Sequence, residues 1–259
     1  MSSEFSELSK LLTGPGEWVV KGANLERWAA LELIREALRL FPSEAVVSTA
    51  FGPGGLCVLD MALEVNPSVE AYYVDTGYAF AETTALAHRW VTERHLRLEV
   101  VRPRTDSTER FRSDPDTCCA ERKVEPNERV LATKKLWIAA LRRDESPSRA
   151  AIPILSELTL ASGHSLLKLC PIATWSEADV WRYILDRGLP YNPLHDRGYR
   201  SIGCAPCTRP VRAGESERAG RWAGTEKQEC GIHVPHRPKQ ADLEPRILTR
   251  RLHVLDRAG

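Results

Sequence analysis

The sequence predicts an α/β fold in which helices flank a largely parallel β-sheet, and three observations support this. Short apolar runs alternate with segments of helical periodicity between residues 24 and 186. Two of the runs end in turns that hold glycine, at residues 51–55 and 75–77. The chain has 259 residues, which is enough to bury a sizeable core.

The first half of the chain gives the clearest elements. Residues 24–40 have apolar side chains at helical spacing, and Pro42 ends the helix. Strands are expected at 44–49, 69–74 and 96–101, and helices at 56–65 and from about 78 to 93. The segment 102–117 is polar and is expected to be loop.

The second half is less regular. Helices are expected at 126–140 and 175–186, a strand at 166–170, and an ordered proline-rich loop at 189–195. From residue 213 the apolar pattern fades, which is typical of a mobile tail. We therefore expect an N-terminal segment (1–22), an α/β domain (23–212) and a flexible C-terminal segment (213–259).

Composition excludes several classes of partner. The 36 basic and 35 acidic residues give a net charge of +1, so no overall charge attracts nucleic acid or a membrane surface. No apolar run approaches the ~20 residues of a bilayer span, and the polar N-terminus does not resemble a signal peptide. The expected location is the cytoplasm, where seven cysteines favour metal or catalytic roles over disulfides.

Both glycine-containing turns follow strands, at the edge of a parallel sheet where ligands usually bind. The turn at 51–55 joins a strand to a helix, so its backbone N–H groups could face a phosphate. It lacks the P-loop pattern, and a plain tight turn explains it equally well. Asp75 and Thr76 could face the same nucleotide, or they could simply cap a helix.

The cysteines form two pairs and three single residues. Cys118 and Cys119 are adjacent, and Cys204 and Cys207 form a CxxC pair; four sulfurs suit a [4Fe–4S] cluster or a structural zinc ion about equally well. The CxxC pair alone could also be a thioredoxin-like redox pair. Cys57 and Cys170 lie in apolar segments and are expected in the core. Cys230 lies in a polar segment, where it would be available for redox chemistry.

In their order along the chain, these motifs resemble the assimilatory sulfonucleotide reductases, specifically the cluster-containing adenylyl-sulfate (APS) reductases. The matching segments are 48–56, 74–77, 118–124, 141–150, 175–183, 203–207, 218–222 and 229–233. The resemblance implies a Rossmann-like fold similar to that of the ATP pyrophosphatases. It covers roughly residues 45 to 233.

The resemblance also implies roles for individual residues. Cys230 would be the nucleophile, and Cys118, Cys119, Cys204 and Cys207 would hold a [4Fe–4S] cluster. Substrate would be bound by Lys123, Arg149, Arg218, Arg221 and His233 near the phosphosulfate, and by Ser48, Phe51, Gly52, Asp75 and Thr76 near the adenosine.

The implied activity is thioredoxin-dependent reduction of APS to sulfite and AMP through a Cys S-sulfonate, in the sulfate assimilation that leads to cysteine. Thioredoxin or glutaredoxin would be the reductant, and the chain could form a homo-oligomer. One alternative is the same chemistry on 3′-phosphoadenylyl sulfate (PAPS). Another is a ligase or tRNA-modifying enzyme on the ATP-pyrophosphatase fold, although the expected Asp-Ser after the glycines is missing.

Overall fold

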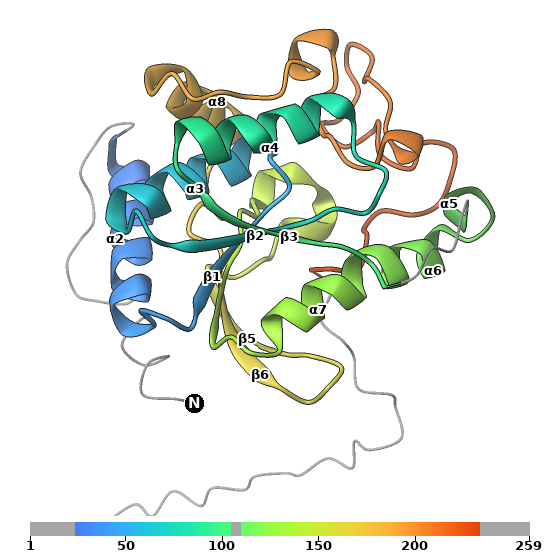
Figure 1. Ribbon diagram of the computed structural model, residues 1–259. Helices are drawn as coiled ribbons and strands as arrows, with labels where there is room; N and C mark the ends of the chain where they lie inside the picture. Colours follow the sequence, from blue (N-terminus) through green and yellow to red (C-terminus); the bar gives the residue numbers. More distant parts are fainter. Residues whose placement is uncertain (1–23, 105–109, 234–259) are drawn as a thin grey trace, which may run out of the picture.

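A computed structural model describes residues 24–104 and 110–233, and a six-stranded sheet lies at its centre (Figure 1). The strand order is β3-β2-β1-β4-β6-β5, and only β5 runs antiparallel to its neighbour. The strands are β1 (Ala45–Thr49), β2 (Glu70–Val74), β3 (Arg97–Val101), β4 (Leu136–Ile138), β5 (Leu155–Thr159) and β6 (Ser165–Leu169). The prediction of a mostly parallel α/β sheet is therefore confirmed.

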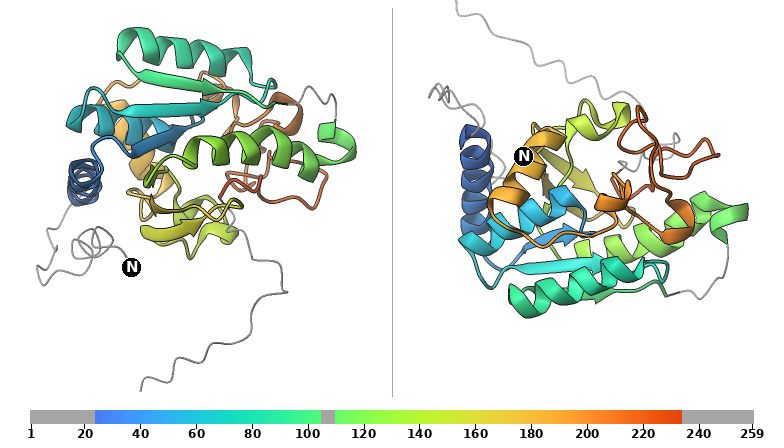
Figure 2. Two further views of the ribbon diagram at one scale, coloured as in Figure 1. Left: turned by 60° about the horizontal axis from the view of Figure 1, so that its bottom comes forward. Right: turned by 90° about the horizontal axis from the view of Figure 1, so that it is seen from above.

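Helices cover both faces of this sheet (Figures 1 and 2). On one face, a single apolar cluster joins strand residues such as Val47 to α2 (Asn24–Leu40), α3 (Pro53–Val65), α4 (Ala81–Glu93) and α8 (Glu177–Asp186). On the other face, Val46 and Trp137 pack with Leu131 of α7 (Glu125–Leu131). Neighbouring residues of a strand thus belong to opposite cores, as the two-residue period of a strand requires.

Short helical pieces complete the described part of the chain. They are α5 (Arg110–Ser113), α6 (Pro115–Cys119), the π-helix η1 (Ala120–Val124), and the 3-10 turns η2 (Arg143–Glu145), η3 (Pro147–Arg149), η4 (His195–Arg197) and η5 (Ala205–Cys207). Within the described residues no helix is both long and apolar enough to cross a membrane.

Two predicted elements need correction, and one strand was missed. The helix expected at 126–140 ends at Leu131, and β4 follows it as a fully buried strand next to β1. A three-residue apolar strand cannot be told from a buried helix segment by periodicity. The segment 102–117, expected to be loop, contains α5 and most of α6. Strand β5 was not predicted, because it is a sheet edge whose burial alternates without a long apolar run.

The C-terminal segment returns over the carboxyl ends of the strands towards α6 (Figure 1, orange to red). The Trp222 N–H donates to the Cys207 carbonyl over 2.9 Å, and Thr208 forms an isolated bridge with Arg221. Residues 213–233 are therefore anchored to the segment that carries Cys204 and Cys207. Residues 1–22 and 234–259 lie outside the described part, and the predicted flexibility of 213–259 stays a prediction.

Candidate functional site

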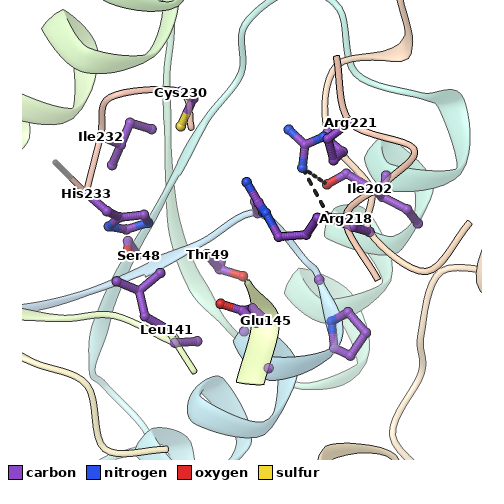
Figure 3. A pocket seen from close by; sticks show the side chains of 18 of the residues that line it. Ser48, Thr49, Leu141, Glu145, Ile202, Arg218, Arg221, Cys230, Ile232 and His233 are labelled. Carbon is purple, nitrogen blue, oxygen red and sulfur yellow. Dashed lines mark hydrogen bonds between the residues drawn. The ribbon is translucent and has the colours of Figure 1, made fainter. Parts of the chain in front are cut away.

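A cavity of about 250 Å³ opens at the carboxyl ends of β1, β2 and β4. Its walls come from the turn after β1, the loop after β4, and the C-terminal segment. Figure 3 shows Cys230 and His233 on one side of this cavity, with Arg218 and Arg221 on the other. The predicted site residues that line it are Ser48, Gly52, Thr76, Lys123, Arg149, Cys204, Arg218, Arg221, Cys230 and His233.

The turn after β1 presents the start of α3 to this cavity. Gly52 is the N-cap, Pro53 is the first helical residue, and no side chain caps the helix. The first backbone N–H groups of α3 therefore lack a side-chain acceptor at the positive end of the helix dipole. Such an end suits an anion.

Phe51 shapes this turn without lining the cavity. Its φ of 55° lies in the left-handed region, which is rare for a residue with a side chain. Its N–H donates to Thr49 Oγ1 over 2.9 Å, and its ring packs edge-on against Tyr73 at 5.6 Å. The buried ring and this bond hold the strained backbone that aims the turn at the cavity.

The second predicted turn divides between two roles. Asp75 does not line the cavity; it accepts from the Gly77 N–H over 3.0 Å and pairs with Arg102. Thr76 lines the cavity, and its hydroxyl lies 3.2 Å from Cys204 Sγ. Its carbonyl accepts from Arg122 over 2.9 Å. The turn therefore links the carboxyl edge of the sheet to the cysteines.

The four paired cysteines line a second cavity of about 10 Å³, beside the first. Cys118 and Cys119 end α6, whose N-cap Asp114 accepts from the Thr117 N–H over 3.1 Å. Cys204 is the N-cap of η5, and Cys207 is the last residue of η5. The arrangement of elements thus brings together two pairs that are far apart in sequence.

Thiol groups and cationic side chains line this second cavity. Arg122 and Lys123 line it, and no carboxylate does among the described residues. Burial raises the pKa of Cys119 to about 11 and also raises the pKa of Cys118 and Cys207. Within the described residues, no three His, Cys, Asp or Glu side chains surround a single-ion position.

Trp222 lines both cavities, as Thr76, Lys123 and Cys204 also do. It is buried, and its φ of 48° is left-handed. Four cations lie within 6 Å of its ring centroid, at 4.7 Å for Arg221, 5.8 Å for Arg218 and 5.9 Å for both Lys123 and Lys227. An aromatic face attracts cations without cancelling their charge, so the pocket keeps a positive field.

Arg149 and Arg218 are held by carboxylates. Arg149 donates through Nε and Nη2 to the two oxygens of Glu229, both over 2.8 Å, and through Nη1 to Glu145. Arg218 Nη2 donates to the same Glu229 over 3.1 Å. The arginines predicted to bind substrate thus already share an anion, which comes from the residue before Cys230.

A second buried ion pair lies in the cavity wall. Arg142 is 3% exposed and donates through Nη2 to Glu217 over 2.9 Å. Burial raises the pKa of Glu217 to about 7, against the opposing effect of Arg142. Because Glu217 precedes Arg218, the pair fastens the arginine segment to the loop after β4.

His233 and Cys230 lie at the end of the described chain. The His233 ring stacks on Trp137 at 5.1 Å and 14°, and burial holds its pKa well below the usual range. Trp137 Nε1 donates to Ser48 Oγ over 2.7 Å, so Ser48 is tied to the same stack. Gly231 has a φ of 92° and turns the chain between Cys230 and the histidine.

Five residues of this site were not singled out by the sequence. Those residues are Arg142, Glu145, Glu217, Trp222 and Glu229. Their partners lie up to 81 positions away along the chain, and no local spacing signals such pairs. All of these residues except Glu217 fall within matching segments of the resemblance, which was the only available signal.

A comparison with known proteins gives the family. Residues 44–210 match the family described as "Phosphoadenosine phosphosulfate reductase domain". A phosphoadenosine 5′-phosphosulfate reductase of Gloeobacter violaceus is 44% identical over 213 residues, covering 78% of this chain and 87% of the relative. An adenosine 5′-phosphosulfate reductase of Halalkalibacterium halodurans is 38% identical over 219 residues, covering 81% and 93%. The chain belongs to this reductase family.

Solved structures agree with this result. The phosphate complex of a phosphoadenylyl-sulfate reductase from Candida auris superposes with a TM-score of 0.63 at 26% identity, covering 80% of this chain and 97% of that one. An FMN adenylyltransferase from Candida glabrata gives 0.56 at 16% identity, covering 87% and 84%. The second likeness shows the fold alone, in line with the predicted nucleotide-binding α/β architecture.

Proposed function

We propose that this chain reduces APS to sulfite and AMP, with Cys230 as the nucleophile and thioredoxin or glutaredoxin as the reductant. One observation carries the proposal: the Cys230 thiol lines the same cavity as the turn before α3 and the side chains of Arg218 and Arg221. A thiol, a phosphate-binding helix start and a cationic wall are the parts that attack on an anionic nucleotide requires.

The reaction divides into two displacements. The Cys230 thiolate attacks the sulfate sulfur, the bond from sulfur to the bridging phosphate oxygen breaks, and AMP leaves with the electron pair. A thiolate of the reductant then attacks Cys230 Sγ, and sulfite leaves with the S–S bonding pair. The second thiol of the reductant resolves the mixed disulfide, which frees Cys230 and leaves the reductant oxidised.

The cationic side chains serve the first displacement. Arg218 and Arg221 face Cys230 across the cavity (Figure 3), where they would neutralise the approaching phosphosulfate. Lys123 lines both cavities, and its charge would reach the same anion. The Nδ1 atom of His233 is buried and has no hydrogen-bond partner, and in its neutral form this ring would hydrogen-bond without adding charge.

The residues of the second cavity fit a [4Fe–4S] cluster. Cys118, Cys119, Cys204 and Cys207 would hold it, because all four line one small space and cysteine is the usual ligand of such clusters. Arg122 and Lys123 would offset the negative charge of the thiolates. When bound, the cluster would supply structural support and a local electric field, not electrons for the displacement at Cys230.

The nucleophile is tested by replacing Cys230. Cys230→Ser should abolish sulfite release from APS and thioredoxin, because serine oxygen is a far weaker nucleophile at neutral pH. The wild-type protein, incubated with APS and no reductant, should gain the mass of SO₃ on the peptide that contains Cys230. Cys57→Ala is the matched control, since Cys57 is a buried thiol that does not itself line the cavity. An unmodified Cys230 peptide would contradict the proposal.

The cofactor is tested by metal and sulfide analysis of anaerobically prepared protein. Iron and acid-labile sulfide should be present together, and Cys204→Ser should lower both, whereas Cys230→Ser should lower neither. Zinc without labile sulfide would contradict the cluster and would show that the four cysteines hold a structural metal ion.

PAPS is the second candidate substrate, because the Gloeobacter violaceus relative is named for it. APS is favoured because several other relatives of 36–38% identity are named for APS. The ratio of kcat/KM for the two nucleotides decides: a ratio above one for APS supports our assignment, and a ratio below one reverses it.

A further inference from the structure

The carboxylate of Glu229 occupies a site built from arginines. It accepts two parallel hydrogen bonds from Arg149, one from Arg218 over 3.1 Å and one from the Ser148 hydroxyl over 3.1 Å. Its side chain is only 16% exposed. A planar guanidinium that grips two oxygens in this way is the geometry proteins use for carboxylates, phosphates and sulfates alike.

While Glu229 is bound, the charges of the side chains in this arginine site sum to zero. Arg149 and Arg218 carry two positive charges, and Glu145 and Glu229 carry two negative ones. Burial alone would raise the pKa of Glu229, but the bonds from Arg149 hold that pKa below its usual range. Each N–H-bearing nitrogen of Arg149 already donates to a carboxylate.

We propose that Glu229 is an internal competitor, whose carboxylate fills the oxyanion site of the free protein and is displaced when the phosphosulfate of the nucleotide binds. The proposal rests on the function proposed above, which places the phosphosulfate at these arginines. While Glu229 holds Arg149 and Arg218, an anion with two charges gains little from these two arginines. It gains two charge-assisted partners once Glu229 has left.

Displacement would also act on the nucleophile. Glu229 and Cys230 are adjacent, and Gly231 turns the chain directly after them. When the phosphosulfate replaces the carboxylate, Glu229 is released from the arginines, so the residue before Cys230 becomes free to move as substrate binds. The apparent affinity for substrate equals the intrinsic affinity multiplied by the fraction of molecules in which the site is free. Glu229 would therefore set the substrate affinity as well as the position of the thiol.

The test compares two ligands that differ in charge. Glu229→Gln keeps the shape and removes the charge; it is placed in the Cys230→Ser protein so that bound APS does not react. Calorimetry then gives the dissociation constants of APS and of adenosine, which carries no anion. Glu226→Gln is the matched control, because Glu226 is exposed and lies three residues earlier in the same segment.

We expect Glu229→Gln to bind APS about tenfold more tightly, the size of one charge-assisted hydrogen bond that no longer has to be broken. Adenosine binding should not change, which also shows that the variant is folded, and Glu226→Gln should match its parent for both ligands. Unchanged or weaker APS binding with normal adenosine binding would overturn the proposal. If wild-type protein binds APS but releases no sulfite, the proposed reaction fails while the competition is still measured; if it does not bind APS, both fail.

Discussion

At the scale of single residues, the pair of Arg142 and Glu217 shows how the cavity wall is held. Both side chains are removed from water, at 3% and 14% exposure, and removing charges from water costs free energy that their attraction only partly returns. Glu145 and Glu177 lie close enough to add negative charge near Glu217. The carboxylate therefore keeps its proton more readily in the folded protein than in the unfolded chain.

This gives a pH prediction. With the pKa of Glu217 raised to about 7, its contribution to stability is fully present below its ordinary value and is lost as pH rises through 7. Glu217→Gln cannot ionise. Relative to this variant, the wild-type free energy of unfolding should fall between pH 4.5 and 7, by at most about 3 kcal/mol. Denaturant titrations at several pH values measure it, and parallel curves for the two proteins would show that Glu217 does not titrate there.

At the scale of elements, the approach of α3 to the loop after β4 depends on glycine. A Cβ on Gly54 would lie 3.3 Å from the Ala140 carbonyl oxygen and 3.2 Å from Ile172 Cδ1. A Cβ on Gly52 would meet nothing within 4 Å. The helix start can therefore sit tightly against the carboxyl end of β4 only because residue 54 lacks a side chain.

Gly54→Ala should accordingly be overpacked and should lower the free energy of unfolding by about 1–3 kcal/mol. Gly52→Ala, two residues earlier, should change the free energy of unfolding by less than about 0.5 kcal/mol. Urea unfolding of both variants beside the wild type makes the comparison. Equal stability of the two variants would mean that α3 shifts freely to admit the methyl group.

The elements also show what a single sequence can predict. The strands β1, β2, β3 and β6 are apolar runs of ordinary length bounded by turns, and their prediction is confirmed. Strand β4 has three residues and lies between two segments of helical composition. Its place in the sheet is decided by pairing with β1 and β6, which are contacts that local periodicity does not contain.

At the scale of the whole molecule, the C-terminal segment adds chemistry to a core that is largely complete without it. Between residues 213 and 233, Trp222 is the only buried hydrophobic residue, and Ile232 is partly buried against the second core cluster. The sheet and its helices form the two main clusters from residues that precede this segment.

Deletion of residues 214–259 should therefore leave a folded protein. We expect a single cooperative unfolding transition and a far-ultraviolet circular dichroism spectrum of α/β type, with adenosine binding retained and sulfite release lost because Cys230 is gone. A non-cooperative transition would contradict the predicted boundary near residue 212.

The sequence predicted only those parts of the candidate site whose residues form a recognisable local pattern. Cysteine pairs at 118–119 and 204–207 are conspicuous, and the structure places them around one cavity. The bonds from Arg149 to Glu229 span 80 positions, so the sequence gives no reason to connect them. Asp75 was assigned to substrate through its neighbours, yet it bonds to Gly77 and Arg102 and does not line the cavity.

The contact of Trp222 with both cavities has an optical consequence. Tryptophan emission depends on nearby charge and on quenching groups, and this indole lines both the cavity of the four cysteines and the arginine-lined pocket. The difference in fluorescence between wild type and Trp222→Phe would thus isolate one intrinsic reporter among seven tryptophans. That reporter would signal filling of either compartment without an attached dye.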